Sequence, residues 1–306
     1  MPDRMPVERD WVATERENSY DPRTGGSWAA TDRPGGSAGV LAQLTRVLFV
    51  QAGLGPGMRV LDIGSGAGEV AFLAAEFVGE HGCVVGVDRD PGVLEVARRR
   101  AAAAGLSNVT FHEGDLHTLP GPPGNPDGAP FDAIVGRLIL MDQPDPVATL
   151  VKLLLHLRPG GLVVCHEADL HAPIVEPPSS LLSRVLGWLT ETAAKAGVEP
   201  RMGPRLYPTF LAAGLPAPVM LAEAVIGGGV AFPGYALWAD LVQAMLPAME
   251  RHGVVTAAEV EIETLPARLC AEVVAGGGCI ATPTFVGAWS KRRTHESGLR
   301  TQGVRG

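Results

Sequence analysis

Three glycines that alternate with other residues follow a short apolar run in the segment 60–70, VLDIGSGAGEV. The apolar run predicts a buried strand, and Gly64, Gly66 and Gly68 allow the backbone after it to take positive φ angles and to approach a ligand closely. Asp62 adds a carboxylate at the end of this strand. The segment therefore predicts a strand, a loop and a helix whose loop holds part of a nucleotide-like ligand.

Two further carboxylates follow the next two predicted strands. Asp88 comes 24 residues after Gly64, at the end of the apolar run 84–87, and can accept hydrogen bonds from both hydroxyls of a ribose. Asp115 follows the run 109–111. Because the carboxyl ends of parallel strands meet at one edge of a sheet, we expect these carboxylates and the glycine loop to line one crevice.

The residue at the start of the helix distinguishes between possible nucleotides. A dinucleotide site usually has the pattern GxGxxG, with the helix N-terminus facing a pyrophosphate, whereas Glu69 occupies the third glycine position here. A carboxylate at this place would repel a pyrophosphate, and Asp62 lies nearby. Glycines with flanking acids instead suit a nucleoside that carries a cationic or amino group and no phosphate, such as S-adenosylmethionine.

Residues 57–169 resemble a class I S-adenosylmethionine-dependent methyltransferase of the ubiquinone/menaquinone-biosynthesis (small-molecule) type. The matching segments follow in the order of that family: VLDIGSGAGEV, VVGVDRDPGVLEVARRRAAAAG, NVTFHEGDLHTLP, FDAIVGRLILM and LLLHLRPGGLVVCHE. The resemblance implies transfer of a methyl group from S-adenosylmethionine to an O, N or C nucleophile, with S-adenosylhomocysteine as the product.

The resemblance also implies roles for individual residues. Nine are expected to bind the cofactor: Asp62, Gly64, Ser65, Gly66, Asp88, Arg89, Asp115, Leu116 and Arg137. Asp62 would hold the methionine amine and Asp88 the ribose hydroxyls, while Asp115 would meet the adenine amine beside the Leu116 amide. Arg137 would lie near the methionine carboxylate or the reacting centre. The alternatives are capping or loop roles for the aspartates and a surface salt bridge for Arg137.

Methyl transfer requires above all that the two reactants are held in a near-attack geometry, and a hydroxyl or amine acceptor often also needs a base. Of the eight histidines, His166 is the candidate for this catalytic role. It directly follows the apolar run 162–165, so we expect it to face the crevice from the carboxyl end of that strand. A structural, hydrogen-bonded role is its alternative. Seven residues are candidates for binding the acceptor, with core packing as the alternative for the apolar ones: Met141, Glu167, His171, Tyr207, Trp238, Met245 and His252.

Strands and helices alternate along the part of the chain that carries these residues. Five largely apolar runs, separated by helical patterns, predict a parallel sheet with both faces covered: 58–63, 84–87, 109–111, 131–135 and 162–165. The segment PGG at 159–161 is expected to end a helix before the fifth strand. Two more strands, at 220–226 and 284–289, are expected to pair antiparallel at the sheet edge. The predicted fold is α/β: a Rossmann-like, doubly wound, seven-stranded sheet with an antiparallel last strand and added helices over the substrate side.

Three segments are expected along the chain. Residues 1–35 are polar but carry aromatic side chains, and are read as an N-terminal segment that forms either a lid over the site or a loosely packed tail. Residues 36–290 would form the methyltransferase domain, with a helical insertion at about 232–275 that caps the substrate. Residues 291–306 have no apolar pattern and are expected to be a mobile tail.

Composition argues against several functional classes. Lys and Arg number 25 against 33 Asp and Glu, and the net charge of −8 disfavours a protein that binds nucleic acid through its backbone. No run of eighteen uncharged apolar residues occurs, and the N-terminus is charged where a signal peptide would be apolar. The four cysteines have no metal-ligand spacing, so no metal is implied. We therefore expect a cytoplasmic protein without a membrane or nucleic-acid partner, and possibly a homodimer.

The expected acceptor is a small, largely apolar molecule, plausibly of secondary metabolism, since the high Ala, Gly and Arg content is typical of a GC-rich genome. Two alternatives stay open. One is a cyclase that binds S-adenosylmethionine on the same fold without transferring its methyl group. The other is a methyltransferase acting on tRNA or protein.

Overall fold

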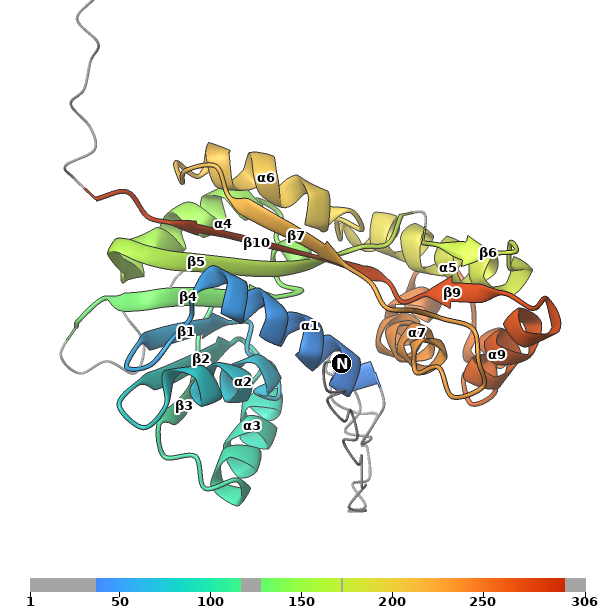
Figure 1. Ribbon diagram of the computed structural model, residues 1–306, viewed down its shortest axis with the longest axis horizontal. Helices are drawn as coiled ribbons and strands as arrows, with labels where there is room; N and C mark the ends of the chain where they lie inside the picture. The colour runs from blue at the N-terminus through green and yellow to red at the C-terminus, as the bar shows by residue number, and fades with distance from the viewer. Residues whose placement is uncertain (1–36, 117–127, 172, 295–306) are drawn as a thin grey trace, which may run out of the picture.

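The computed structural model describes residues 37–116, 128–171 and 173–294 (Figure 1). The expected lid at 1–35 and nearly all of the expected tail at 291–306 lie outside the described residues, so both stay predictions.

Seven strands form one sheet in the order β3-β2-β1-β4-β5-β10-β7. Their bounds are β1 Arg59–Ile63, β2 Cys83–Asp88, β3 Val109–Glu113, β4 Phe131–Arg137, β5 Leu157–Asp169, β7 Val219–Glu223 and β10 Thr284–Lys291. The first five pair in parallel, whereas β10 pairs antiparallel with both β5 and β7. The predicted fold, a doubly wound seven-stranded sheet whose last strand is antiparallel, is confirmed.

Helices cover both faces of this sheet (Figure 1). On one face lie α1 Ser37–Ala52, α2 Glu69–Val78 and α3 Pro91–Ala103, and on the other lie α4 Pro146–Leu153 and α6 Met202–Ala212. Local sequence explains where some of them begin. The Asp90 carboxylate accepts from the amides of Gly92 and Val93, and Pro91 occupies the first turn, so α3 starts with a side-chain cap.

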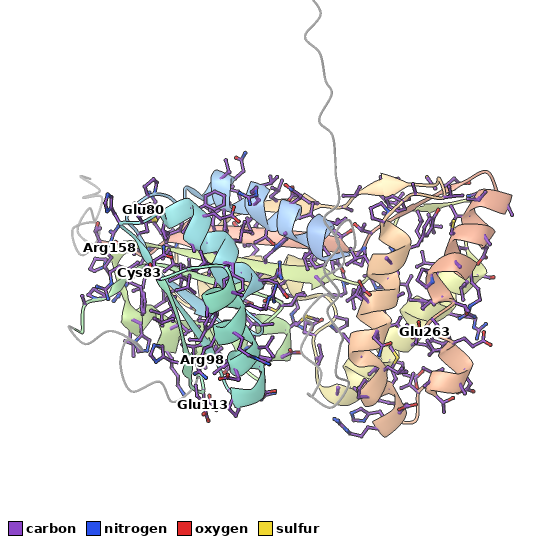
Figure 2. All side chains as sticks on the ribbon, turned by 90° about the horizontal axis from the view of Figure 1, so that it is seen from below. Glu80, Cys83, Arg98, Glu113, Arg158 and Glu263 are labelled. Atoms are coloured by element: carbon purple, nitrogen blue, oxygen red, sulfur yellow. The ribbon has the colours of Figure 1, made fainter. Side chains whose placement is uncertain are left out.

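A second group of helices lies beyond the carboxyl end of β5, beside the sheet (Figures 1 and 2). We call this group the cap; its members are α5 Ser180–Ala196, α7 Gly234–Arg251, α8 Ala257–Val260 and α9 Leu265–Ala275. A small antiparallel sheet borders it, formed by β6 Val175–Glu176, β9 Cys279–Ala281 and β8 Ile226–Gly227. The fully buried Trp238 ties α7 to this sheet, because its indole N–H donates to the Ala281 carbonyl at 2.9 Å. The function of the cap as a substrate roof stays a prediction.

Two short 3-10 turns complete the elements, η1 Leu140–Asp142 after β4 and η2 Leu154–His156 before β5. The expected break at 159–161 is wrong, since β5 runs without interruption from Leu157 to Asp169. Pairing with the C-terminal strand explains the difference. The register runs from Thr284 opposite Asp169 to Lys291 opposite Leu162, and the Gly160 amide extends it by donating to the Arg292 carbonyl.

Helix α1 approaches the sheet closely over β10. A Cβ atom on Gly287 would overlap the side chain of Leu48, which is fully buried on α1. Gly287→Ala is therefore expected to lower the free energy of unfolding by about 1–3 kcal/mol, as overpacking of a core does, measured by urea denaturation. Gly187→Ala is the matched control, because a Cβ at this α5 glycine meets no atom within 4 Å. A helical Gly→Ala change should leave stability equal or raise it by ~1 kcal/mol, so equal losses for both variants would contradict the packing argument.

Candidate functional site

A cavity of about 610 Å³ opens at the carboxyl ends of β1, β2 and β4. Of the nine residues expected to bind the cofactor, eight line this cavity: Gly64, Ser65, Gly66, Asp88, Arg89, Asp115, Leu116 and Arg137. Because the carboxyl ends of parallel strands meet at one edge of the sheet, residues as far apart in the sequence as Gly64 and Arg137 line the same cavity. Their individual roles stay predictions.

The glycine loop between β1 and α2 has the backbone conformation that its sequence predicts. Gly64, Gly66 and Gly68 have φ angles of 63°, 52° and 93°, in the left-handed region that a side chain disfavours. The Gly68 turn leads directly into Glu69, the first residue of α2. A Cβ on Gly64 would overlap Ile139, so the loop also lies against the segment after β4.

Asp88 connects the glycine loop to the start of α3. One carboxylate oxygen accepts from the Gly66 amide at 2.9 Å, and the other accepts from the Asp90 amide at 3.0 Å. The carboxylate lines the cavity while it makes both contacts. It is therefore held by the backbone at the place where a ribose would meet it.

Asp62 is the ninth predicted residue, and it lies behind the loop instead of lining the cavity. Its side chain is buried, and within the described residues neither carboxylate oxygen has a hydrogen-bond partner at normal distance and angle, although the Ala71 amide is near enough to lower its pKa. Burial raises the pKa of Asp62 well above its usual value, against the opposing effect of the Arg137 charge. A buried carboxylate without donors is costly, which fits a loop that receives a cationic amine from a ligand.

Arg137 reaches the same cavity from the end of β4. Its guanidinium forms an ion pair with Glu69 at 3.1 Å, and Glu69 in turn pairs with Arg100 at 3.3 Å. Only 8% of the Arg137 side chain is exposed, so this is not the surface salt bridge that the sequence left open. Glu69 itself lines the cavity and places a negative charge at the helix start, where a pyrophosphate would otherwise bind.

His166 lies inside β5, between β4 and β10, because the strand continues to Asp169. The expectation that it faces the crevice from the end of the strand is therefore wrong. The ring is 1% exposed and lies against Phe285, and its Nδ1 is 3.1 Å from the Thr45 hydroxyl of α1. Burial and, after it, the Arg137 charge lower its pKa to about 3. This placement favours the structural alternative; the role as a base stays a prediction.

Glu167 points to the opposite face of β5 and fixes the segment after β4. Its fully buried carboxylate accepts from the amides of Ile139 and Leu140 at 3.1 and 2.8 Å, and more weakly from Met141 at 3.4 Å. Burial raises the pKa of Glu167 to about 8, although these amides oppose the shift. The residue thus holds Ile139 and the start of η1, directly after Leu138, whose φ of 56° is positive.

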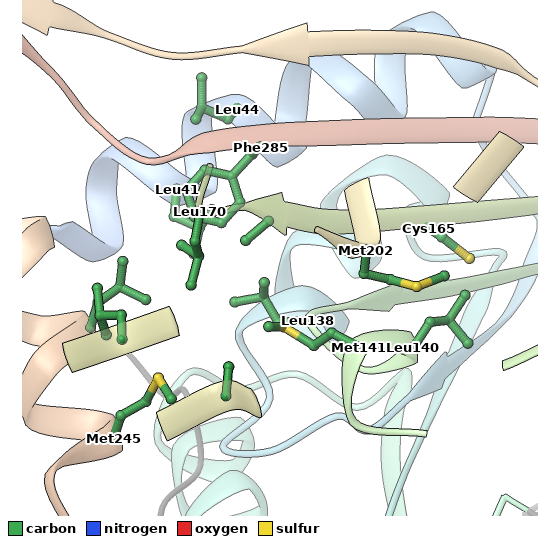
Figure 3. Packing of buried hydrophobic residues seen from close by; sticks show 14 of the residues in the cluster. Leu41, Leu44, Leu138, Leu140, Met141, Cys165, Leu170, Met202, Met245 and Phe285 are labelled. Atoms are coloured by element: carbon green, nitrogen blue, oxygen red, sulfur yellow. The ribbon is translucent and has the colours of Figure 1, made fainter. Parts of the chain in front are cut away.

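The candidates for binding the acceptor are not gathered at this cavity. Met141 is buried beside Leu138 in the hydrophobic core (Figure 3), and Trp238 and Met245 are buried in the same core. The others are Glu167, described above, the exposed His171, Tyr207 on α6, and His252 at the end of α7. None of these seven lines the cavity, so their assignment to an acceptor pocket stays untested.

Sequence reasoning missed a set of cavity residues that follow β4. Leu138, Ile139, Asp142, Gln143 and Pro144 line the wall beyond Arg137. The rule that carboxyl ends of strands form the crevice applies to them as it does to the aspartates. These five residues belong to no ligand-binding motif, so their place after the carboxyl end of β4 was the signal that could have identified them.

Within residues 37–116, 128–171 and 173–294, no three His, Cys, Asp or Glu side chains gather closely enough to hold a metal ion. In the same part of the chain, no helix has the length and apolar character needed to cross a membrane.

Comparison with known proteins agrees with this geometry. Residues 54–196 match the model of a methyltransferase domain. The chain is 41% identical over 107 residues to aklanonic acid methyltransferase DauC of a Streptomyces species, covering 35% of this chain and 46% of the relative. It is 33% identical over 134 residues to demethylmenaquinone methyltransferase of Symbiobacterium thermophilum, covering 44% and 51%. The chain thus spans about half the length of these relatives.

A solved structure shows the same fold over most of the chain. The YcgJ protein of Bacillus subtilis superposes with a TM-score of 0.52 at 20% identity, covering 84% of this chain and 98% of that one. At this identity the likeness concerns the fold alone. Together with the matched segment, it confirms the resemblance at this level: residues 54–196 match a methyltransferase domain and have the expected fold.

Proposed function

We propose that this protein transfers a methyl group from S-adenosylmethionine to an O, N or C nucleophile of a small, largely apolar molecule. The observation that carries the proposal is the cavity at the carboxyl ends of β1, β2 and β4, where a glycine loop is surrounded by acids. Among the described residues, five acidic side chains line it against two basic ones, Arg89 and Arg137. This negative balance suits a sulfonium nucleoside and disfavours a dinucleotide.

The chain's own residues would bind and orient the two reactants. Asp88 would accept the ribose hydroxyls, Asp62 would meet the methionine amine behind the loop, and Arg137 would hold the carboxylate end. S-adenosylmethionine, when bound, supplies a methyl group on a positively charged sulfur. The protein's part is then to align an acceptor with that methyl group and to exclude water, which places the catalytic demand on position more than on acid–base chemistry.

Two observations support a small-molecule acceptor. Both relatives described above, aklanonic acid methyltransferase and demethylmenaquinone methyltransferase, are named for small-molecule acceptors. In addition, the cap lies beyond the carboxyl end of β5, on the side of the sheet edge where the cavity opens. Cap helices would give an apolar acceptor a surface to bind. The possible homodimer and the cytoplasmic location belong to this proposal as expectations.

Turnover of S-adenosylmethionine tests the proposal. The full chain is incubated with S-adenosylmethionine and a panel of apolar hydroxy-, amino- and quinone-type acceptors, and S-adenosylhomocysteine is measured by mass spectrometry. We expect its formation to depend on one acceptor class and to be lost in an Asp88→Ala chain. Binding without turnover of any acceptor would favour the non-methylating cyclase, and turnover only with tRNA or protein would favour the macromolecular alternative.

A further inference from the structure

Arg137 is held at the cavity by polar side chains of three other elements, α1, α2 and β5. On one side it pairs with Glu69; on the other, its Nη1 donates to the hydroxyl of Thr45 on α1 at 3.3 Å. The same hydroxyl contacts His166 of β5. Thr45 and His166 are each 1% exposed, so this contact is shielded from solvent.

The Thr45 hydroxyl contacts the Leu41 carbonyl, His166 and Arg137, and it can donate its single hydrogen to only one of them. A hydroxyl has one hydrogen to donate and two lone pairs to accept with. Its hydrogen goes to the Leu41 carbonyl, four residues earlier on α1, at 2.8 Å. With its hydrogen on that carbonyl, Thr45 accepts from Arg137 and from His166, and the neutral His166 ring then carries its proton on Nδ1.

The backbone places these three side chains together. Arg137 and His166 lie opposite each other in the parallel pairing of β4 and β5, so their side chains share one face of the sheet. Gly287 lies opposite His166 on its other side, in β10. Because a Cβ on Gly287 would overlap Leu48, this glycine allows α1 to approach closely enough for Thr45 to reach both side chains.

We propose that Thr45 and His166 are positioning residues for Arg137: His166 and the Leu41 carbonyl orient the Thr45 hydroxyl, and this hydroxyl holds the guanidinium toward the methionine end of the bound cofactor. Arg137 uses two of its five N–H groups for Thr45 and Glu69, and the guanidinium lines the cavity. The inference rests on the proposed function, since it concerns affinity for the amino-acid part of S-adenosylmethionine.

The test compares two ligands that differ in that part alone. S-adenosylhomocysteine carries the amino-acid end, whereas 5′-methylthioadenosine lacks it and keeps the adenosine. Calorimetry on the full chain gives the dissociation constant of each. For Thr45→Val, which keeps the side-chain shape and removes the hydroxyl, we expect affinity for S-adenosylhomocysteine to fall about tenfold, as for loss of one hydrogen bond to a charged group. Affinity for 5′-methylthioadenosine should not change.

Three further variants sharpen the test. Thr45→Ser keeps the hydroxyl and should retain the wild-type ratio of the two affinities. Thr209→Val is the matched control, because that α6 hydroxyl makes the same bond to the carbonyl four residues earlier, of Arg205, away from the cavity. In an Arg137→Ala background, Thr45→Val should have no further effect on either ligand, because its action is through Arg137.

The outcomes separate this inference from the proposed function. If the wild-type chain binds neither ligand, the proposed function fails and the inference falls with it. If the wild type binds both, but Thr45→Val leaves the ratio of affinities unchanged or weakens both ligands equally, the positioning role is overturned while the cofactor assignment stands. An undiminished effect of Thr45→Val in the Arg137→Ala background would overturn it as well.

Discussion

Asp88→Ala is expected to weaken binding of S-adenosylhomocysteine by roughly a hundredfold, because two charge-assisted hydrogen bonds to the ribose, each contributing about 1.5 kcal/mol, would be lost. The same substitution removes the acceptor for the Gly66 amide, which loosens the glycine loop and acts in the same direction. Isothermal titration calorimetry measures the change directly, without a known acceptor.

Asp132→Ala is the matched control for this variant. Asp132 also accepts from a backbone amide, that of Arg59 at 2.8 Å, and also contacts a second donor, Arg158. It lies near the start of β4, away from the carboxyl ends that form the cavity. Asp132→Ala should leave the affinity unchanged. Equal affinity of the Asp88→Ala chain and the wild type would contradict the ribose assignment.

The residues whose place was predicted from the sequence are those that local rules determine. Gly64, Gly66 and Gly68 adopt positive φ because the turn from β1 into α2 requires it, and they are the three glycines of the segment 60–70. Asp88 and Asp115 reach the cavity because Asp88 ends β2 and Asp115 lies two residues after the end of β3, at the carboxyl ends of parallel strands. The glycine turn can be predicted from the residues around it. The place of the aspartates follows from the alternation of strands and helices, which makes the sheet parallel.

His166 shows where such local reasoning ends. From residues 159–165 alone, a strand that stops before His166 is a reasonable expectation, because glycines and a proline precede a short apolar run. The strand continues because β10, more than 110 residues further along the chain, pairs with it as far as Asp169. Tertiary pairing of this kind has no local pattern, and it changes His166 from a crevice residue to a buried one.

The apolar candidates for the acceptor site failed to gather for a related reason. Spacing shows that Met141, Trp238 and Met245 lie on buried faces, but it does not show whether a ligand or another helix covers each face. In the structure other core side chains cover them. Glu167 was predicted to bind the acceptor. Its contacts with the amides after β4 depend on a positive φ at Leu138 that the sequence does not indicate.

Acidification is expected to destabilise the protein through His166. Its pKa of about 3 in the folded state, against an ordinary 6.5 in the unfolded chain, means that the unfolded state takes up a proton first as the pH falls. The stabilising contribution is complete above pH 6.5 and declines as the pH falls from there toward 3. Between pH 7 and 4 the loss amounts to about 3 kcal/mol, at about 1.4 kcal/mol for each pH unit of the window.

His166→Gln isolates this effect, because glutamine can still donate to Thr45 and does not titrate. The comparison is needed because burial raises the pKa of both Asp62 and Glu167, so these groups favour the folded state as the pH falls and oppose the histidine. Urea denaturation of both chains from pH 7 to 4 gives the difference in unfolding free energy. From pH 7 to pH 4, we expect the wild type to lose about 3 kcal/mol more unfolding free energy than His166→Gln. Parallel curves would show that His166 titrates alike in both states, and hence that the buried neutral ring contacting Thr45 does not exist in solution.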